Sequence, residues 1–154
     1  MTSKNKIEIY KELHKELEDR KKKQVLYQQD HVLVEYDEVN EWIMADWLGY
    51  QSEETLKDGF TIISDAVKRF GTSKILNDNS HVLGIWTPAV QWLAGTYFPG
   101  LYKEGIKKFA WVNSPSALSR FSTEETLKEV NHMKMIKTFD SIEEAKTWLK
   151  SDQP

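Results

Sequence analysis

The stretch SEETLKDGFTIISDAVKRFGTSKILNDNS, residues 52–80, joins a helical pattern to a strand-like run. Its apolar residues recur at three- and four-residue spacing, which predicts an amphipathic helix with one buried face. Ser52 is a favourable N-cap, and Gly71 is a favourable residue to end the helix. Residues 74–77 then predict a buried strand. A helix that leads directly into a strand is typical of a crossover unit in a sheet covered by helices.

Elements of both kinds are predicted on either side of this unit. Before it, three runs with strand patterns predict a hairpin and a third strand: residues 24–28, 31–36 and 42–48. After it, the pattern predicts a helix, a strand, one or two short helices, a strand and a last helix: residues 88–102, 107–112, 115–130, 134–139 and 141–150. Four residues stand where a further N-cap is expected: Thr87, Ser114, Ser122 and Ser141. We therefore predict a single small α/β domain whose four- to five-stranded mixed sheet has helices packed on it.

A charged helix is predicted to precede this domain. Residues 1–23 would form this appendage, residues 24–150 the domain and residues 151–154 a tail. The appendage is rich in Lys and Glu and carries a thin apolar stripe that consists of Ile7, Tyr10, Leu13 and Leu17. Because so narrow a stripe cannot form a core by itself, we expect the helix to pack on the domain or on a second copy of itself.

The composition excludes several classes of protein. The 154 residues include no cysteine, which excludes disulfides, thiolate metal sites and cysteine nucleophiles. The first residues contain no apolar secretion signal, and no apolar run approaches the ~20 residues of a membrane-spanning helix, so we expect a cytoplasmic location. The formal net charge is -3, and no basic stripe alternates with aromatic residues, so no nucleic acid is expected as a partner. The four histidines lie in separate segments without metal-ligand spacing, and no metal or cofactor is expected.

Asp78 is the one candidate for a catalytic group, because it follows a predicted buried strand, where open α/β sheets place their ligand sites. In one interpretation it acts as a base or binds a polar group. In the other, residues 77–80 close the turn after the strand, since Asp and Asn side chains bond readily to nearby backbone. The motif contains no histidine or second carboxylate to orient a proton, so we favour the turn.

A segment without charge follows Asp78: the next Asp, Glu, Lys or Arg is Lys103. The helix predicted inside it is apolar around most of its circumference, so we expect its outer face to meet the N-terminal helix, a second subunit or an apolar ligand. Pro99 and Gly100 are expected to break or kink this helix near its end. The candidate residues for a ligand or partner surface are Asp78, Asn79, Trp86, Trp92, Tyr97 and Phe98.

Residues 32–150 resemble the SpoIIAA-like (STAS-like) family in the order of a hairpin, a helix and strand-helix pairs. The Asp-Leu-Ser type strand end of that family corresponds to residues 78–80. Its Asp-Ser-Ser-Gly type loop, which carries a phosphorylated serine, corresponds to Trp86-Thr87-Pro88-Ala89. The resemblance implies a regulatory interaction domain in which Thr87 or Ser80 can be phosphorylated.

The loop departs from the family pattern at most of its positions. Trp86 replaces the Asp, Pro88 the second Ser and Ala89 the Gly, so a kinase that reads the usual loop is not expected to read this one. The chain therefore looks closer to the uncharacterised bacterial branch of the family than to its sigma-factor regulators. The same broad fold also resembles the lipid-binding CRAL-TRIO domains.

Three functional hypotheses follow from these observations. The first is a non-enzymatic, cytoplasmic interaction module that forms homodimers through the helix at 88–102 and the N-terminal helix. The second is a binder of an apolar or lipid-like ligand beneath the helix at 88–102. The third and weakest is an enzyme that uses Asp78, because no second catalytic group can be named.

Overall fold

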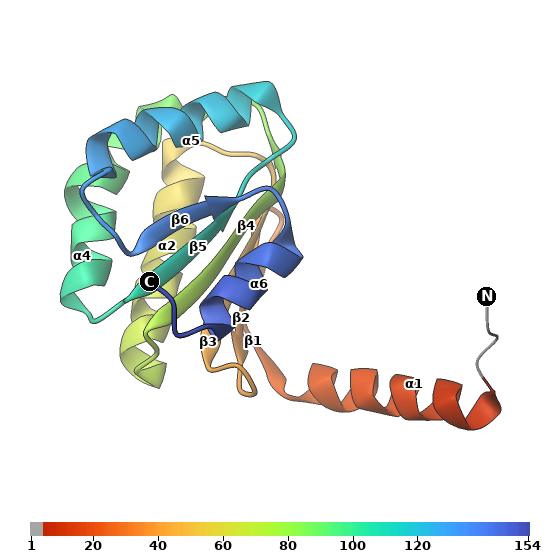
Figure 1. The fold of residues 1–154 in the computed structure, drawn as a ribbon. Helices are drawn as coiled ribbons and strands as arrows, with labels where there is room; N and C mark the ends of the chain where they lie inside the picture. The colour runs from red at the N-terminus through yellow and green to blue at the C-terminus, as the bar shows by residue number, and fades with distance from the viewer. Residues whose placement is uncertain (1–4) are drawn as a thin grey trace.

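The computed structural model describes residues 5–154, without the side chain of Lys21, and shows one sheet with helices on both faces (Figure 1). The strands are β1 (Lys23–Gln29), β2 (Val32–Asp37), β3 (Trp42–Tyr50), β4 (Lys74–Leu83), β5 (Lys108–Val112) and β6 (Ile136–Phe139). The longer helices are α1 (Lys6–Lys21), α2 (Glu53–Phe70), α5 (Ala117–Val130) and α6 (Ile142–Lys150). Four short helical segments follow one another and are together called helix 87–103: η1 (Thr87–Ala89), α3 (Val90–Trp92), η2 (Leu93–Tyr97) and α4 (Phe98–Lys103).

The six strands lie in the sheet in the order in which they occur in the chain. β1, β2 and β3 are antiparallel neighbours, whereas β3 to β6 run parallel. Parallel neighbours require crossover connections, and α2, helix 87–103 and α5 provide them. The prediction of a single α/β domain with a mixed sheet is confirmed, with six strands rather than four or five.

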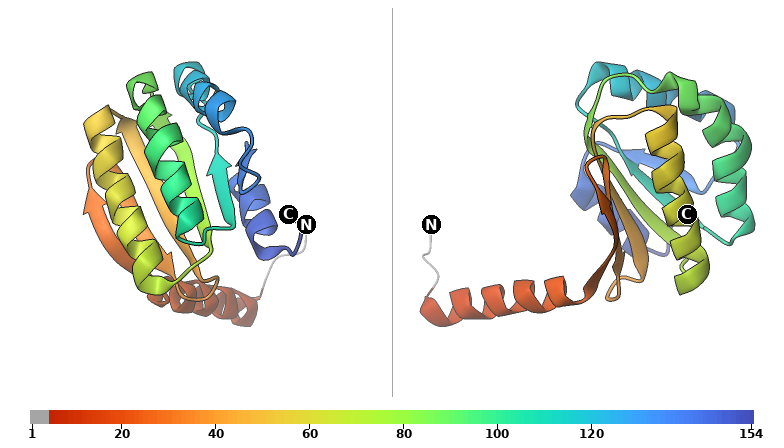
Figure 2. Two further views of the ribbon diagram at one scale, coloured as in Figure 1. Left: turned by 90° about the vertical axis from the view of Figure 1, so that its left-hand side faces the viewer. Right: turned by 180° about the vertical axis from the view of Figure 1, so that it is seen from behind.

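The helices form two unequal layers on the sheet. α2, helix 87–103 and α5 lie side by side over one face, and α6 covers part of the other (Figure 2). The larger core lies under the three helices and contains Trp47, Phe60 and Phe98. The smaller core lies under α6 and contains Trp42 and Trp148. β5 contributes side chains to both cores, which explains why its sequence does not alternate between apolar and polar residues.

α2 begins and ends where its sequence predicts. The Ser52 hydroxyl accepts the backbone N–H of Thr55 at 3.1 Å, and the Thr55 hydroxyl accepts the backbone N–H of Ser52 at 2.9 Å. Gly71 ends the helix in the left-handed conformation, with φ 63°. Gly59 lies against the ring of Trp47, where an added Cβ would come within 2.4 Å of the indole. The helix can therefore approach β3 this closely only because position 59 has no side chain.

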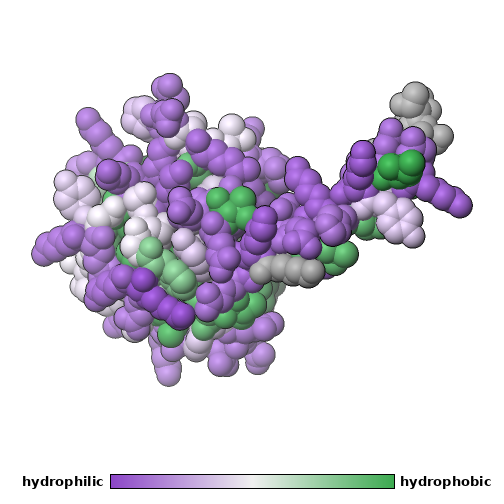
Figure 3. Space-filling model, turned by 90° about the horizontal axis from the view of Figure 1, so that it is seen from below, coloured by the Kyte–Doolittle hydropathy of each residue, from purple (hydrophilic) through white to green (hydrophobic). Residues whose placement is uncertain are grey.

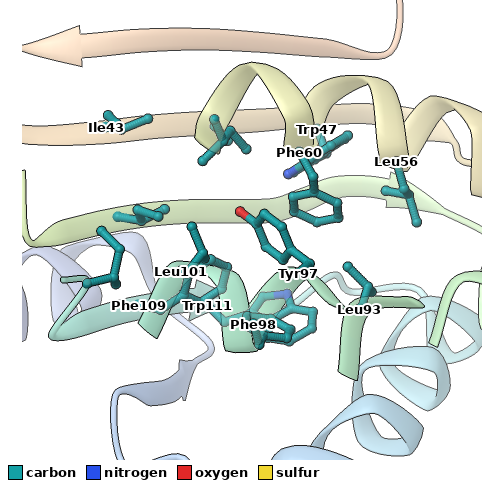
Figure 4. Packing of buried hydrophobic residues seen from close by; sticks show 14 of the residues in the cluster. Ile43, Trp47, Leu56, Phe60, Leu93, Tyr97, Phe98, Leu101, Phe109 and Trp111 are labelled. Carbon is teal, nitrogen blue, oxygen red and sulfur yellow. The ribbon is translucent and has the colours of Figure 1, made fainter. Parts of the chain in front are cut away.

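Trp86, just before helix 87–103, and the aromatic residues predicted from the sequence within the helix belong to the core or pack against it. Trp86, Tyr97 and Phe98 expose only 3%, 4% and 0% of their surface, and Trp92 is partly buried against Phe60. In Figure 4, Tyr97 faces Phe60 across the space between this helix and α2, with ring centroids 4.0 Å apart. The prediction that these aromatic side chains face a partner is thus wrong for the three buried ones. They are covered because α2 and α5 flank the helix and the sheet lies beneath it.

Helix 87–103 continues past Pro99, so Pro99 and Gly100 do not break it, and the alternative of a kink there stays a prediction. The turn before the proline is widened into a π-helix, in which the backbone N–H of Phe98 bonds to the carbonyl of Leu93. This wider turn accommodates a proline, which has no N–H and whose ring crowds the preceding turn. The helix then ends at Lys103, with the N–H of Glu104 bonded to the carbonyl of Gly100.

Only one of the four further N-caps is confirmed, that of Ser141, whose hydroxyl accepts the N–H of Glu144 at 3.4 Å. Thr87 lies inside η1 without a side-chain cap bond. Ser122 lies inside α5, where its hydroxyl accepts the backbone N–H of Trp86 at 2.9 Å. Ser114 precedes the helix by three residues and donates to the carbonyl of Val82 at 2.6 Å. The Ser122 hydroxyl thus holds α5 to Trp86, and the Ser114 hydroxyl holds the loop before α5 to β4.

α1 stands away from the domain, as Figures 1 and 2 show. Within the described residues its close backbone contacts are with β1, the strand that follows it, and its apolar stripe is exposed. The predicted packing of this helix on the domain is therefore not observed. No helix in the described part of the chain has the length and apolar character needed to cross a membrane.

Candidate functional site at the carboxyl edge of the sheet

β4 runs for ten residues, from Lys74 to Leu83, through the segment that was predicted to be a turn. The prediction that the strand ends at Asn77 is wrong, because the backbone stays in the sheet as far as Leu83. Asn77 and Asn79 bond to other side chains, and Asp78 accepts a backbone N–H without ending the strand. Asn77, Asp78 and Asn79 are all buried, with 1%, 4% and 6% of their surface exposed. Alternate residues of this segment point to opposite faces of the sheet, so they form two separate sites.

The inner site lies under the helical layer and holds the two asparagines. The Trp47 indole N–H donates to Asn77 Oδ1 at 2.8 Å, and Asn77 Nδ2 donates to Asn79 Oδ1 at 3.1 Å. Beside them is a cavity of about 10 Å³, which Trp86 and Trp111 also line. This volume is about that needed for one water molecule. It leaves no room for an acyl chain at this place beneath helix 87–103.

The outer site brings Asp46, Asp78 and His81 together at the carboxyl ends of β3 and β4. Asp46 pairs with Asp78, but two residues further along β3, Leu48 pairs with His81. β4 therefore contains one extra residue, a β-bulge, and this places His81 on the same face of the sheet as Asp78. Bulges of this kind commonly redirect a side chain beside a functional site.

Hydrogen bonds fix both carboxylates of the outer site. His81 Nδ1 lies 3.3 Å from Asp46 Oδ1, and the backbone N–H of Ser80 donates to Asp78 Oδ1 at 2.8 Å. Burial raises the pKa of Asp46; the hydrogen bond from His81 acts against this rise, and the charge of Asp78 adds to it. The outer site thus holds two neighbouring carboxylates whose negative charges are only partly compensated.

The arrangement does not form a nucleophilic triad. His81 uses the same ring nitrogen, Nδ1, toward Asp46 Oδ1 at 3.3 Å and Ser80 Oγ at 3.4 Å. A triad requires the acid on one ring nitrogen and the hydroxyl on the other, so that the imidazole can take up the proton of the hydroxyl. His81 is therefore not placed to activate Ser80 as a nucleophile.

Three side chains of the outer site have the chemistry of metal ligands. One carboxylate oxygen each from Asp46 and Asp78 and one ring nitrogen of His81 lie within 4.8 Å of one another. Carboxylate and imidazole together suit ions such as Zn²⁺, with bonds of about 2.0–2.2 Å. In the tetrahedral geometry of Zn²⁺, ligand atoms at these bond lengths are about 3.3–3.6 Å apart. His81 Nδ1 and Asp46 Oδ1 already have about this separation, at 3.3 Å.

The residues predicted from the sequence do not form one site. Asp78 lies in the outer site, Asn79 and Trp86 line the inner one, and Tyr97 and Phe98 are in the core. Trp86 holds α5, because its indole N–H donates to Ser119 Oγ at 3.1 Å. The two candidates for phosphorylation, Thr87 and Ser80, are both partly exposed.

Sequence reasoning missed Asp46 and His81. Asp78 received little weight as a catalytic group because its motif contains no histidine or second carboxylate. The fold places a histidine, His81, and a second carboxylate, Asp46, beside it. The period-2 pattern of β3 places Asp46 on the face away from Trp47, which was a usable indication. No pattern in the sequence indicates the extra residue of β4 that places His81 on the same face of the sheet as Asp78.

Searches against protein-family models, curated proteins and solved structures found no match for the chain. The resemblance to the SpoIIAA-like family therefore stays a prediction based on the residues quoted above.

Proposed function

We propose that the protein is a non-enzymatic interaction module that self-associates through α1, with a second copy of α1 as the partner. The observation that carries this proposal is the exposed apolar stripe of α1, which no other described element covers. Its members expose more than half of their surface: Ile7 67%, Tyr10 74%, Leu13 51% and Leu17 54%. Figure 3 shows α1 as an arm whose apolar side chains lie open beside charged ones.

A helix of this kind gains little stability alone. In proteins, most helical stability comes from packing of the apolar face, and isolated helices shorter than about 12–15 residues are marginal in water even for Ala-rich sequences. α1 has 16 residues and an N-cap, since the Asn5 side chain accepts the N–H of Glu8 at 2.9 Å. The cap satisfies a backbone N–H at the start of the helix, but it leaves the apolar stripe exposed. Pairing with another helix would bury it.

The charges beside the stripe favour a second copy in antiparallel orientation. At 100° per residue, Lys11 and Glu18 lie on the same side of the stripe, seven residues apart. In an antiparallel pair centred near residues 14 and 15, Lys11 of each copy meets Glu18 of the other. The twofold symmetry makes this attraction occur twice.

The regulatory part of this proposal follows the SpoIIAA-like resemblance. The partly exposed hydroxyls of Thr87 and Ser80 would be its modification sites, and a cytoplasmic location belongs to the same proposal. Phosphate at Thr87 would add negative charge where helix 87–103 begins, which favours an anion. The sequence around Thr87 does not identify the kinase.

Size-exclusion chromatography with light scattering tests self-association. We expect the wild-type chain to approach twice the 18.0 kDa monomer mass as its concentration rises. The variant Leu13→Ser/Leu17→Ser should stay at the monomer mass, because it removes the centre of the stripe. Glu12→Ser/Lys15→Ser places the same two serines on the opposite side of α1 and should associate like wild type. Circular dichroism of each variant checks that the domain is folded. A dimer that survives Leu13→Ser/Leu17→Ser would refute the proposal.

A further inference from the structure

A large groove opens at the edge of the sheet where β5 and β6 begin, opposite the edge that holds Asp78. Its volume is about 750 Å³, within the range of about 300–1,000 Å³ that is usual for small-molecule sites. It lies between the end of helix 87–103, the loops before β5 and β6, and the end of α6. The lining residues are Pro99, Tyr102, Lys103, Ile106, Lys107, His132, Met133, Lys134, Met135, Trp148 and Pro154.

The floor of the groove is apolar. Ile106, Met135 and Trp148 expose only 2%, 6% and 7% of their surface, because they close the ends of the two cores. Tyr102 is 68% exposed and extends the apolar surface outward. Contact with such a floor would remove the surface of a hydrocarbon chain from water, which is the main source of affinity for an apolar ligand.

The rim of the groove is cationic. Lys103, Lys107 and Lys134 are exposed on it, and no acidic side chain is among the lining residues, all of which lie in the part of the chain that the structure describes. Two lysines outside the lining stand over the ring of Trp148: Lys137 Nζ lies 5.7 Å from its centre, and Lys108 Nζ lies 4.9 Å from it. The Lys108 ammonium also donates to the backbone carbonyls of Trp148 and Ser151. A concentration of one sign of charge around a low-dielectric floor attracts an anion.

The indole N–H of Trp148, a residue of the groove floor, lacks a partner among the described residues. Its Nε1 is buried and has no acceptor within the described residues. Buried polar groups in native proteins nearly always have a partner, and each exception requires an explanation. Because Nε1 is inaccessible to water, the ring would have to turn before an oxygen bound in the groove could accept its N–H.

We propose that this groove binds a long-chain fatty carboxylate, with the hydrocarbon chain on the floor formed by Ile106, Met135 and Trp148 and the carboxylate among the rim lysines. The site lies at the end of helix 87–103, not beneath it, and uses none of the residues predicted from the sequence for an apolar ligand. It is also independent of α1, so it can be tested whether or not the protein self-associates.

Isothermal titration calorimetry with three twelve-carbon probes tests the ligand class. Laurate and dodecyltrimethylammonium are titrated into the full chain below their critical micelle concentrations, and dodecanol is titrated below its solubility limit. We expect laurate to bind at least tenfold more tightly than dodecanol and the cationic probe to bind most weakly. Decanoate should bind about 16-fold more weakly than laurate, because each methylene removed costs about fourfold in affinity. Equal affinity for laurate and dodecanol would overturn the assignment of an anionic ligand.

Variants locate the site. Lys107→Gln/Lys134→Gln removes two rim charges from exposed positions and should weaken laurate binding at least tenfold while leaving dodecanol binding unchanged. Lys57→Gln/Lys128→Gln removes the same charge from α2 and α5 and should bind laurate like wild type. Unchanged affinity in the rim variant would place the ligand elsewhere and refute the proposal. Binding to vesicles of anionic phospholipid, without binding of monomeric laurate, would refute it in favour of a membrane surface.

Discussion

Replacement of Asn77 by Leu is the substitution that most clearly separates the observed strand from the predicted turn. Leu has the branched shape of Asn and suits a strand, but it is bulkier and cannot accept the indole N–H of Trp47 or donate to Asn79 Oδ1. Both groups are buried, and an unsatisfied buried group costs about 1–3 kcal/mol. The adjacent cavity of about 10 Å³ holds one water at most. We therefore expect Asn77→Leu to lower the free energy of unfolding by about 2–4 kcal/mol.

Urea denaturation followed by circular dichroism measures this loss, and Trp47→Phe provides the matched control. Trp47→Phe removes the donor, so Asn77→Leu in that background should cost about 1–2 kcal/mol less than in wild type. If Asn77 instead lay in a turn at the protein surface, Asn77→Leu would change stability by less than about 0.5 kcal/mol in either background. That result would refute the account of β4.

Two other substitutions test close packing and charge burial. Gly59→Ala places a Cβ about where the Trp47 ring stands, 2.4 Å away, and should lower the free energy of unfolding by about 1–3 kcal/mol. Gly95→Ala is the control, because a Cβ at this helical position meets nothing within 4 Å and should not destabilise the protein. Urea denaturation measures both variants. A larger loss of stability for Gly95→Ala than for Gly59→Ala would contradict the packing of α2 on β3. Because burial raises the pKa of Asp46, the native state binds its proton more tightly than the unfolded state does, and stability is lost as pH rises through the folded pKa. Asp46→Asn should therefore melt at a higher temperature than wild type at pH 7, with a gain that disappears at acid pH; a gain independent of pH would show that the charge of Asp46 is not its source.

The parts of the fold that were predicted correctly depend on neighbouring residues. Ser52 and Gly71 act within one turn of α2, and the apolar period between them identifies its buried face. The alternation of helices and strands after β3 was sufficient to predict the class. Each of these patterns is local, so it can be read without knowledge of which distant segments meet.

The parts that were predicted wrongly depend on distant residues. Asn77 is a strand residue because Trp47, 30 positions earlier, supplies a partner for its side chain. Ser122 accepts a backbone N–H from Trp86 instead of capping a helix. Asp78 was judged without Asp46, which the sheet places beside it. Local preference for turns and caps was overridden in each case by a tertiary hydrogen bond or strand pairing.

The antiparallel pairing of α1 is tested most directly by disulfide formation, because the chain has no cysteine of its own. In a pair centred near residues 14 and 15, two copies of residue 14 lie almost opposite each other. Two copies of residue 7 are then about 22 Å apart along the axis, at 1.5 Å per residue. A disulfide needs Cα atoms about 4.4–6.8 Å apart. His14→Cys should therefore form a covalent dimer under mild oxidation, and Ile7→Cys should remain monomeric in a non-reducing gel. Equal cross-linking of both variants, or of neither, would contradict the account.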